Sequence, residues 1–374
     1  MQLKKYQFVL CIVGAFLAGT VLTGSVAAFQ MNGGGASKGG DSKISELYEY
    51  IDNYYYTDYD EDDLINGAYK GFVQGLGDPY SAYMTKEEYD SWNVSVTGEY
   101  SGVGITFTEN DDGEFVVLAI NKNSPAKKAG IKEGDVLLTV DGKTYDSSDS
   151  MAVAIRGKKG SKVTLEYSRE GDIKKVEMIR DNISQESVEY EMLEGDVGYI
   201  AITQFIDHTS EDFQKALSAL EKQGAKSLVL DLRDNGGGLV DECVEIADAF
   251  LDKGVVCYVK DKDGSLDSYD AKDGKTKLKT VVLINENSAS AAEILSAALK
   301  DNGFTIVGQT SFGKGVIQTT VEFDDGSALK LTIMQYLSPD KKVIHGKGVA
   351  PNIKCTDKES TEKDEQLEKA LQSL

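Results

Sequence analysis

Residues 226–233 read KSLVLDLR, a mostly apolar run without the regular polar alternation of a half-buried strand. Such a run is typical of a strand buried on both faces, in a parallel sheet that helices cover. Helical spacing follows at 239–251, then a second apolar strand at 279–285 and a second helix at 291–303. This alternation predicts an α/β core built from βα units over residues 183–356.

The chain ahead of this core changes its apolar period. Residues 43–95 carry apolar side chains at helical spacing and predict an N-terminal helical segment of two or three helices, without visible catalytic residues. From residue 96 the period becomes two, so 96–182 predict a small β-rich unit. The last segment, 357–374, ends in the amphipathic stretch DEQLEKALQSL and predicts an acidic C-terminal helix.

The N-terminus carries an export signal. Two lysines precede the apolar run 8–29, which at roughly 20 residues is long enough to cross a bilayer. Small residues at 25–27 resemble a cleavage site, so residues 1–30 are either an uncleaved anchor or a cleaved signal peptide. In both cases the body is exported, and it is anchored to the cell membrane or secreted accordingly. The Gly/Ser-rich residues 31–42 predict a flexible tether.

Charge and composition exclude several classes of function. The formal net charge is −22, from 40 basic and 62 acidic residues, which disfavours nucleic acid as a partner. Cys243, Cys257 and Cys355 have no metal-ligand spacing, and His208 and His345 are too few for a His-based zinc site. We therefore expect neither a metal nor another cofactor.

The β-rich unit 96–182 resembles a PDZ domain. The resemblance is carried by Ser124-Pro125-Ala126, Ala129-Gly130-Ile131, Gly134-Asp135 and Val140-Asp141-Gly142. It implies a groove that takes an extended peptide C-terminus by strand addition. The loop Gly102-Val103-Gly104-Ile105 would bind the terminal carboxylate through its backbone N–H groups. A Gly-rich turn without a ligand is the alternative interpretation.

Three stretches at predicted strand ends carry chemistry. They are DLRDNGGG (231–238), NENSASAAEI (285–294) and SFGKGVIQ (311–318). In the first, three glycines allow the backbone to approach a ligand closely. The second places Ser290 at a helix N-terminus, and the third isolates Lys314 between two glycines.

Together these stretches can form a Ser/Lys hydrolase site. Ser290 would attack a carbonyl, with Lys314 as general base after burial has lowered its pKa from about 10.4. Gln318 lies four residues after the lysine, so in an extended segment both share one face, and it would orient the amine. The oxyanion would take backbone N–H groups from Ala291 and from the loop 236–238.

Each stretch also has a simpler interpretation. Ser290 and Glu293 form an S-x-x-E capping box, and a lysine between glycines is often a turn residue. The chain contains no G-x-S-x-G elbow, H-E-x-x-H helix or P-loop. A Ser-His-Asp triad would have to use His208 or His345, which leaves a His-dependent hydrolase as one alternative.

The three stretches together resemble the C-terminal processing peptidases, or tail-specific proteases, which are family S41 serine peptidases with a PDZ domain. The motifs are SASASEI-like, FGKG-x-x-Q and DLR-x-N-x-GG, and GLGDPYSAYMTKEEY and GKGVAPNI extend the resemblance along the chain. It implies a crotonase/ClpP-like βα core, with Ser290 rather than Ser288 as the nucleophile and Gly237 as an oxyanion donor. Gly236 replaces a common proline and Ala292 a common serine.

The resemblance implies an exported serine endopeptidase that recognises the C-terminal tails of protein substrates and cleaves through an acyl-enzyme. Arg156 matches an arginine at the boundary between the PDZ domain and the core, and we expect it to couple tail binding to activity. The N-terminal helices and the terminal helix match regions that support dimerisation in some members, so a homodimer is one expected assembly. The alternative class is a catalytically silent PDZ scaffold that binds protein C-termini.

Overall fold

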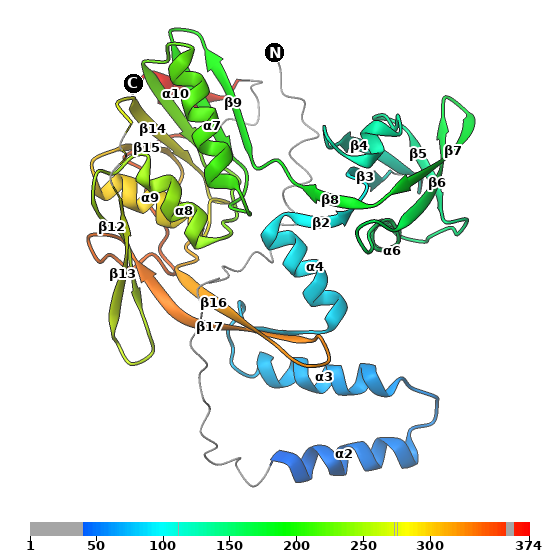
Figure 1. Cartoon of the computed structure of the whole chain (residues 1–374). Helices are drawn as coiled ribbons and strands as arrows, with labels where there is room; N and C mark the ends of the chain where they lie inside the picture. Colours follow the sequence, from blue (N-terminus) through cyan, green and yellow to red (C-terminus); the bar gives the residue numbers. More distant parts are fainter. Residues whose placement is uncertain (1–39, 111, 273, 275, 357–362) are drawn as a thin grey trace.

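A six-stranded sheet forms the centre of the C-terminal body in the computed structural model (Figure 1), which describes residues 40–110, 112–272, 274, 276–356 and 363–374. The strand order is β18-β15-β14-β11-β10-β9, and all neighbours are parallel except β9 and β10. The strands are β9 (Val188–Leu193), β10 (Val197–Ile202), β11 (Ser227–Asp231), β14 (Lys279–Ile284), β15 (Thr305–Gly308) and β18 (Ile353–Lys354). The central position of β11 explains its apolar run, because both of its faces are buried.

Helices cover both faces of this sheet. One face packs against α7 (Thr209–Lys222), α8 (Val240–Asp248) and α9 (Ala291–Asp301), and these share one hydrophobic core with Leu228 and Leu230 of β11. The other face, which includes Val229, packs against the short α10 (Glu365–Leu371) near the C-terminus. The two faces of one strand therefore serve two separate cores.

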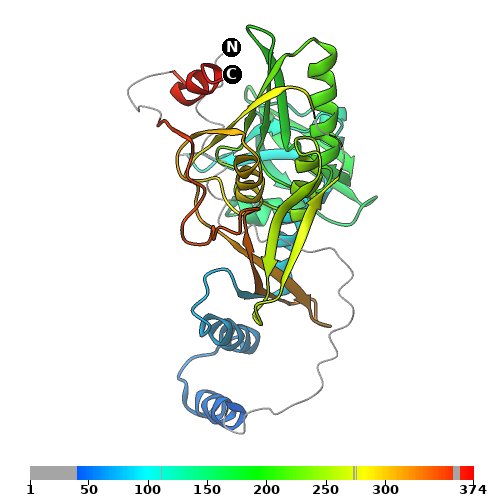
Figure 2. The same cartoon turned by 90° about the vertical axis from the view of Figure 1, so that its left-hand side faces the viewer.

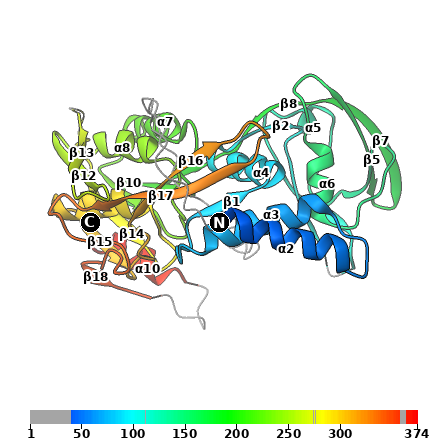
Figure 3. The same ribbon diagram turned by 90° about the horizontal axis from the view of Figure 1, so that it is seen from below.

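A second sheet lies beside the first and extends away from it. Its order is β1-β17-β12-β13, with β16 pairing on the other edge of β17. The strands are β1 (Ala82–Met84), β12 (Gly254–Lys260), β13 (Leu266–Ala271), β16 (Val316–Glu322) and β17 (Ala328–Leu337). The β16–β17 ribbon reaches from the body toward the N-terminal helices (Figures 1 and 3). It thereby connects the core with a segment far from it in sequence.

The N-terminal region contains three helices, α2 (Gly40–Tyr54), α3 (Glu61–Gln74) and α4 (Lys86–Thr97). The helix α2 lies at the outer end of the molecule, with α3 between it and the ribbon (Figures 1 and 2). Two expectations need correction. Residues 40–42 of the predicted tether form the first turn of α2. These residues are not apolar, so the apolar period did not include them in the helix. Strand β1 interrupts the predicted helical segment 43–95, since pairing with β17 stabilises three residues that are too few to show a period.

The β-rich unit is a five-stranded sheet in the order β3-β4-β5-β6-β7. Its strands are β3 (Ile105–Glu109), β4 (Phe115–Ile120), β5 (Val136–Val140), β6 (Lys162–Arg169) and β7 (Asp172–Ile179), and its helices are α5 (Pro125–Lys128) and α6 (Ser148–Ile155). A ribbon of β2 (Glu99–Gly102) and β8 (Asp181–Ser184) joins the unit to the body. Because α4 continues to Thr97, the unit begins just after the predicted residue 96. The core sheet with its helices, the inserted β-rich unit and the N-terminal helices agree with the predicted architecture.

Among the described residues, no helix combines the length and apolar character needed to cross a bilayer. The predicted signal or anchor segment 8–29 lies outside the described residues, as do tether residues 31–39 and residues 357–362 ahead of α10.

Candidate active site

The fold brings the three predicted stretches together at one edge of the central sheet. The glycine loop follows β11, Ser290 follows β14, and Lys314 lies in the connection from β15 to β16. Strands β11, β14 and β15 are parallel neighbours. Their carboxyl ends therefore meet at the same edge, where open α/β sheets place their sites.

Ser290 is the N-cap residue of α9, but its hydroxyl does not cap the helix. It is fully buried, and its backbone has φ 55° and ψ −117°, a conformation that costs a non-glycine residue about 1–3 kcal/mol. Its Oγ makes no hydrogen bond with any described residue. Ser288 is the structural serine of the pair, because its Oγ donates to the Leu232 carbonyl (2.7 Å) and accepts from the Asn285 N–H (2.9 Å).

One buried carboxylate, that of Glu293, holds the serine and lysine segments together. Its Oε2 accepts the backbone N–H of Ser290 at 2.9 Å and of Lys314 at 2.8 Å. Its Oε1 accepts the Ser311 hydroxyl at 2.6 Å and the Gly313 N–H at 2.7 Å. Burial raises the pKa of Glu293, and these four hydrogen bonds oppose that rise. The sequence indicated Glu293 only as part of a capping box, and nothing in it showed the partners in the lysine loop.

A tyrosine hydroxyl ties the same two residues from the other side. Tyr336 is fully buried on β17, and its Oη lies within hydrogen-bond reach of the Ser290 carbonyl (3.1 Å) and of the Lys314 carbonyl. Glu293 therefore accepts the backbone N–H groups of both Ser290 and Lys314, and Tyr336 lies against the backbone carbonyl groups of both residues. No sequence motif pointed to Tyr336.

Lys314 is a buried lysine whose pKa is lowered. Its side chain is only 7% exposed, and burial is the main cause that lowers its pKa to about 8. The charge of Lys330 lowers this pKa further, while Glu293 and Asp78 raise it. At pH 7 roughly a tenth of such an amine is neutral, compared with less than about a thousandth for a lysine in water.

Gln318 lies on β16 and is almost fully buried. Its Nε2 donates to Thr332 Oγ1 at 3.3 Å, and its Oε1 makes no hydrogen bond with a described residue. Lys314 lies just before β16, and Gln318 is the third residue of that strand. The register shift beside Gln318 places an extra residue in β17 rather than in β16, because Ile317 pairs with Met334 and Gln318 with Thr332. Both side chains are buried, and the expectation that they share one face stays a prediction.

The glycine loop packs directly against the candidate nucleophile. Gly237 has φ 101°, and a Cβ at this position would lie 2.6 Å from Ser290 Cβ and 3.0 Å from Ala291 N. The expected N–H of Gly237 is engaged here, because Asn235 folds back and accepts it at 2.8 Å through Oδ1. Ala291 is the first residue of α9, where a helix leaves an N–H without an intrahelical acceptor.

The N-terminal region also reaches this site, although its residues 43–95 show no catalytic pattern in the sequence. The Tyr80 ring centroid lies 5.3 Å from Lys314 Nζ and 6.2 Å from the His345 ring. Asp78 holds this turn by accepting the Ser81 hydroxyl (2.6 Å) and the Tyr80 N–H (3.1 Å). The GLGDPYSAYMTKEEY motif was the only sequence signal for it.

The histidine alternative gains little from the structure. His208 precedes α7 with its side chain 55% exposed, and its Nδ1 lies 3.9 Å from a Glu211 oxygen. His345 is exposed. Its backbone lies against Gly315, where an added Cβ would be 2.3 Å from the backbone nitrogen of His345.

The β-rich unit has a hollow beside an unpaired strand edge. Strand β3 is an edge strand, and a hollow of about 240 Å³ lies between it and α6. Its lining includes Gly104, Ile105 and Arg156. Gly104 has φ +76°, and a Cβ there would lie 2.3 Å from Ser124 Cβ, so the loop requires glycine.

Two residues of the predicted carboxylate loop do not line this groove. Val103 is fully buried in the core of the unit, and Gly102 pairs with Asp181 in the β2–β8 ribbon. Arg156 ends α6, and its guanidinium carbon lies 5.4 Å from the ring centroid of Tyr100 on β2. It therefore lies between the groove and the ribbon that leads to the body.

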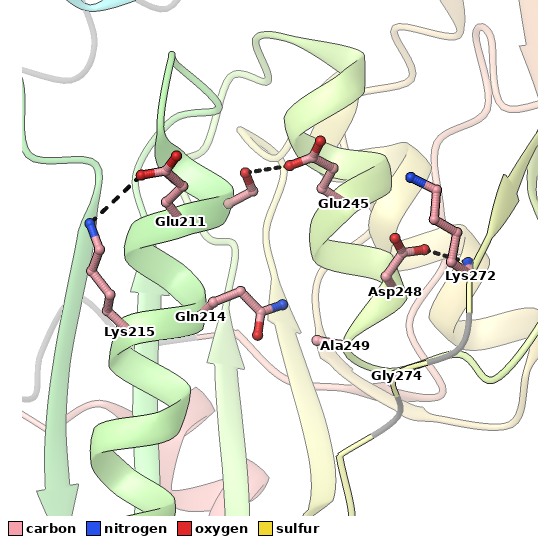
Figure 4. Close-up of a pocket in the computed structure, with 9 residues that line it drawn as sticks. Glu211, Gln214, Lys215, Glu245, Asp248, Ala249, Lys272 and Gly274 are labelled. Atoms are coloured by element: carbon pink, nitrogen blue, oxygen red, sulfur yellow. Dashed lines mark hydrogen bonds and ion pairs between the residues drawn. The ribbon is translucent and has the colours of Figure 1, made fainter.

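A larger hollow of about 620 Å³ lies between α7 and α8, away from these residues (Figure 4). Several of its polar groups are paired locally. Ser210 Oγ donates to Glu245 at 2.8 Å, and the Lys272 N–H donates to Asp248 at 2.7 Å. The lining includes none of the three predicted stretches, so we do not assign the chemistry there. Within the described part of the chain, no group of His, Cys, Asp and Glu could hold a metal ion.

Family profiles match three consecutive parts of the chain. They are the N-terminal domain of the activating protease CtpB at residues 24–88, a PDZ domain at 101–179 and peptidase family S41 at 196–355. The carboxy-terminal processing protease CtpA of Bacillus subtilis (strain 168) is 40% identical over 364 residues, which cover 95% of this chain and 77% of that protein. A probable CtpA-like serine protease of Staphylococcus aureus (strain COL) is 40% identical over 365 residues, covering 94% and 73%.

A solved structure agrees with these relatives. The photosystem II D1 C-terminal processing protease superposes with a TM-score of 0.51 at 26% identity, over 98% of this chain and 97% of that chain. Fold and relatives together define a serine peptidase that carries an inserted PDZ domain. The chain belongs to peptidase family S41 and, within it, to the C-terminal processing proteases. The predicted family and the predicted serine-type endopeptidase class are confirmed.

Proposed function

We propose that this protein is an exported endopeptidase that binds the C-terminal tails of protein substrates in its PDZ groove and cleaves them with Ser290, Lys314 and Gln318. The observation that carries the catalytic part is the Glu293 carboxylate, which joins the backbone of Ser290 to that of a buried lysine. A binding scaffold would need neither a strained buried serine nor a lysine with a pKa of about 8.

The reaction proceeds in two halves. Ser290 Oγ attacks the scissile carbonyl carbon, and its proton passes to the neutral Lys314 amine. Collapse of the tetrahedral intermediate breaks the C–N bond, and the Lys314 ammonium returns the proton to the departing amine. Water then attacks the Ser290 ester, with Lys314 again accepting a proton. Lys314 returns this proton to Ser290 Oγ as the ester bond breaks, which releases the acid product and restores the free serine and the neutral amine. Gln318 orients the lysine amine through its amide oxygen.

The oxyanion lies at the N-terminus of α9. Ala291 supplies an N–H that has no intrahelical acceptor, and the helix dipole favours the negative charge there. Gly237 supplies a second N–H once it exchanges its hydrogen bond with Asn235 Oδ1 for one with the oxyanion. Gly237 lies so close to Ser290 that no side chain fits at position 237.

Tail recognition is assigned to the hollow between β3 and α6. An extended peptide pairs with the edge of β3, and its carboxylate is held by the loop at Gly104 and Ile105. Arg156 couples the groove to the body, since it contacts Tyr100 at the start of the β2–β8 ribbon. Export follows from the apolar run 8–29, which leaves the body outside the cytoplasm whether or not it is cleaved. Cell fractionation with a C-terminal reporter distinguishes an anchored from a secreted form.

The catalytic assignment is tested by cleavage of an unfolded protein with an apolar C-terminus. We expect Ser290→Ala and Lys314→Ala each to lower turnover by at least about a thousandfold. Ser296→Ala is the matched control, because this buried serine lies on the same helix and its Oγ donates to a backbone carbonyl. A His208→Ala/His345→Ala double variant should keep its activity. Full activity of Lys314→Ala, or its loss in the histidine variant, refutes the proposal.

A further inference from the structure

Lys330 is a buried lysine that the reaction above does not use. It lies on β17, only 5% exposed, with Thr320 of β16 opposite it on one side and Ala82 of β1 on the other. Its Nζ lies 5.7 Å from the ring centroid of Trp92. Among the described residues, no carboxylate forms an ion pair with it. A buried ammonium without such a partner is costly, so its position calls for an explanation.

Strand geometry directs Lys330 toward the catalytic residues. Residues two apart on a strand share a face, so Lys330 lies on the face of Thr332, whose hydroxyl accepts from Gln318. The segment that pairs with Lys330 through Ala82 also carries Tyr80, whose ring contacts Lys314 Nζ at 5.3 Å. Both buried lysines therefore lie against residues of the same N-terminal segment, Lys314 against Tyr80 and Lys330 against Ala82.

The charges around Lys314 come from several elements. Glu293 lies on α9, Lys330 on β17 and Asp78 on the turn before β1. The Tyr80 and Tyr336 hydroxyls and the His345 imidazole complete the set of titratable groups from the packed elements. Burial and Lys330 lower the Lys314 pKa, whereas Glu293 and Asp78 raise it.

The two lysines differ in what favours their charged forms. Burial lowers the pKa of Lys330 as well, but Asp78 opposes this, and the face of Trp92 attracts a cation. Repulsion between two ammonium groups in a low-dielectric site makes one of them release its proton. With Lys330 stabilised over the indole, that one is Lys314.

We propose that Lys330 is a positioning residue of the peptidase, a second buried cation that holds Lys314 in its neutral, proton-accepting form. This inference rests on the proposed function, in which Lys314 is the general base. Asp78 serves both lysines, and the N-terminal segment thereby becomes part of the catalytic apparatus.

The test is the pH dependence of single-turnover cleavage by the full-length protein, from about pH 6 to about pH 10. Lys330→Met removes the repelling charge, so the Lys314 pKa rises and the midpoint of the rate profile moves upward. We expect the rate at pH 7 to fall by about tenfold, while the curves converge at high pH. Lys330→Arg keeps the charge and should keep the wild-type midpoint. Lys330→Gln, a second neutral variant, should repeat the upward shift.

The outcomes separate this inference from the function on which it rests. A neutral variant with the wild-type midpoint, or with an equal loss of rate at every pH, overturns the role of Lys330. That second pattern is what a purely structural lysine would give, and thermal melting identifies it independently. A wild-type profile without any rise toward alkaline pH instead refutes Lys314 as the base, and with it the proposed mechanism.

Discussion

Glu293 is the residue whose removal should affect the candidate site most after the reactive groups themselves. Its two oxygens accept four hydrogen bonds, two of them from the backbones of Ser290 and Lys314. It touches neither the substrate nor the transferred proton in the proposed reaction, so it is a positioning residue. Its negative charge also raises the Lys314 pKa, which gives it a second, measurable effect.

Glu293→Gln should lower kcat by about a hundredfold, because a small displacement of a reacting group is that costly. A glutamine has one acceptor oxygen, so at least one of the four donors turns toward an NH₂ group, at a cost of about 1–3 kcal/mol in the free energy of unfolding. The lost negative charge lowers the Lys314 pKa, so the midpoint of the pH–rate profile should move downward, opposite to the Lys330 variants. Steady-state kinetics across pH provides the check, and an unchanged kcat would contradict this role.

Gly237→Ala should abolish most activity. The new Cβ would lie 2.6 Å from Ser290 Cβ and 2.8 Å from the Ala289 carbonyl, in a backbone with φ 101°. Gly303→Ala is the matched control, since Gly303 has φ +87° but nothing within 4 Å of a new Cβ. The control should lose only about 1 kcal/mol of stability from backbone strain and keep its kcat. Equal kinetic effects of the two variants would show that contact with Ser290 does not matter.

The local settings that the motifs indicated are present in the structure. Ser290 lies at the N-terminus of α9, and Lys314 lies between two glycines ahead of β16. Their roles in catalysis stay predictions. The function of Glu293 in the lysine loop was not identifiable, because its partners Ser311 and Gly313 are 18 and 20 residues away in sequence. The engagement of the Gly237 N–H by Asn235 also depends on a side-chain rotation that no sequence pattern encodes.

Helices and strands were easiest to predict where the element is long and deeply buried, because its apolar side chains then form a clear pattern in the sequence. Strands β11 and β14 lie at the centre of the sheet, and their apolar runs identified them at once. Strand β1 has three residues and forms only because β17 offers it an edge. That short strand places Tyr80 and Asp78 near Lys314, so the least predictable strand brings an unexpected part of the chain to the site.

The α2–α3 pair carries apolar side chains that nothing in the described chain covers. Leu47 is 54% exposed on α2, and Phe72 is 82% exposed on α3. We propose that a second copy of the chain covers this face. Leu47→Glu/Phe72→Glu should then convert a dimer into a monomer in light scattering coupled to size exclusion. A wild-type protein that stays monomeric at all concentrations contradicts the proposal, and Tyr190→Glu on β9 is the matched surface control.

The PDZ unit and the peptidase body are joined by short, continuous contacts. The β2–β8 ribbon leads from the groove to Gly98, where a Cβ would lie 2.3 Å from Ile206 Cδ1. The adjacent Phe205 donates its N–H to the Gly237 carbonyl at 3.0 Å. A peptide bound in the groove therefore lies at one end of a chain of contacts that ends beside Ser290.

If the groove recognises C-terminal tails, the affinity for a peptide should depend on its free terminal carboxylate. A peptide with an amidated C-terminus should bind at least about tenfold more weakly than its free acid, because a charge-assisted set of hydrogen bonds is lost. Arg156→Ala should slow cleavage of a protein with a free tail but leave hydrolysis of a short internal peptide unchanged. Fluorescence anisotropy and cleavage assays measure the two effects, and equal binding of acid and amide would contradict tail recognition.

The central claim is that Ser290 is a nucleophile activated by a neutral Lys314. The most direct measurement is the rate at which a fluorophosphonate labels the full-length protein as a function of pH, with the labelled residue identified by peptide mass mapping. We predict one adduct, on Ser290, whose rate of formation rises with pH around a midpoint near pH 8, because the amine must be neutral to accept the proton. An adduct on another serine, or a labelling rate that Lys314→Met leaves unchanged, would contradict the account.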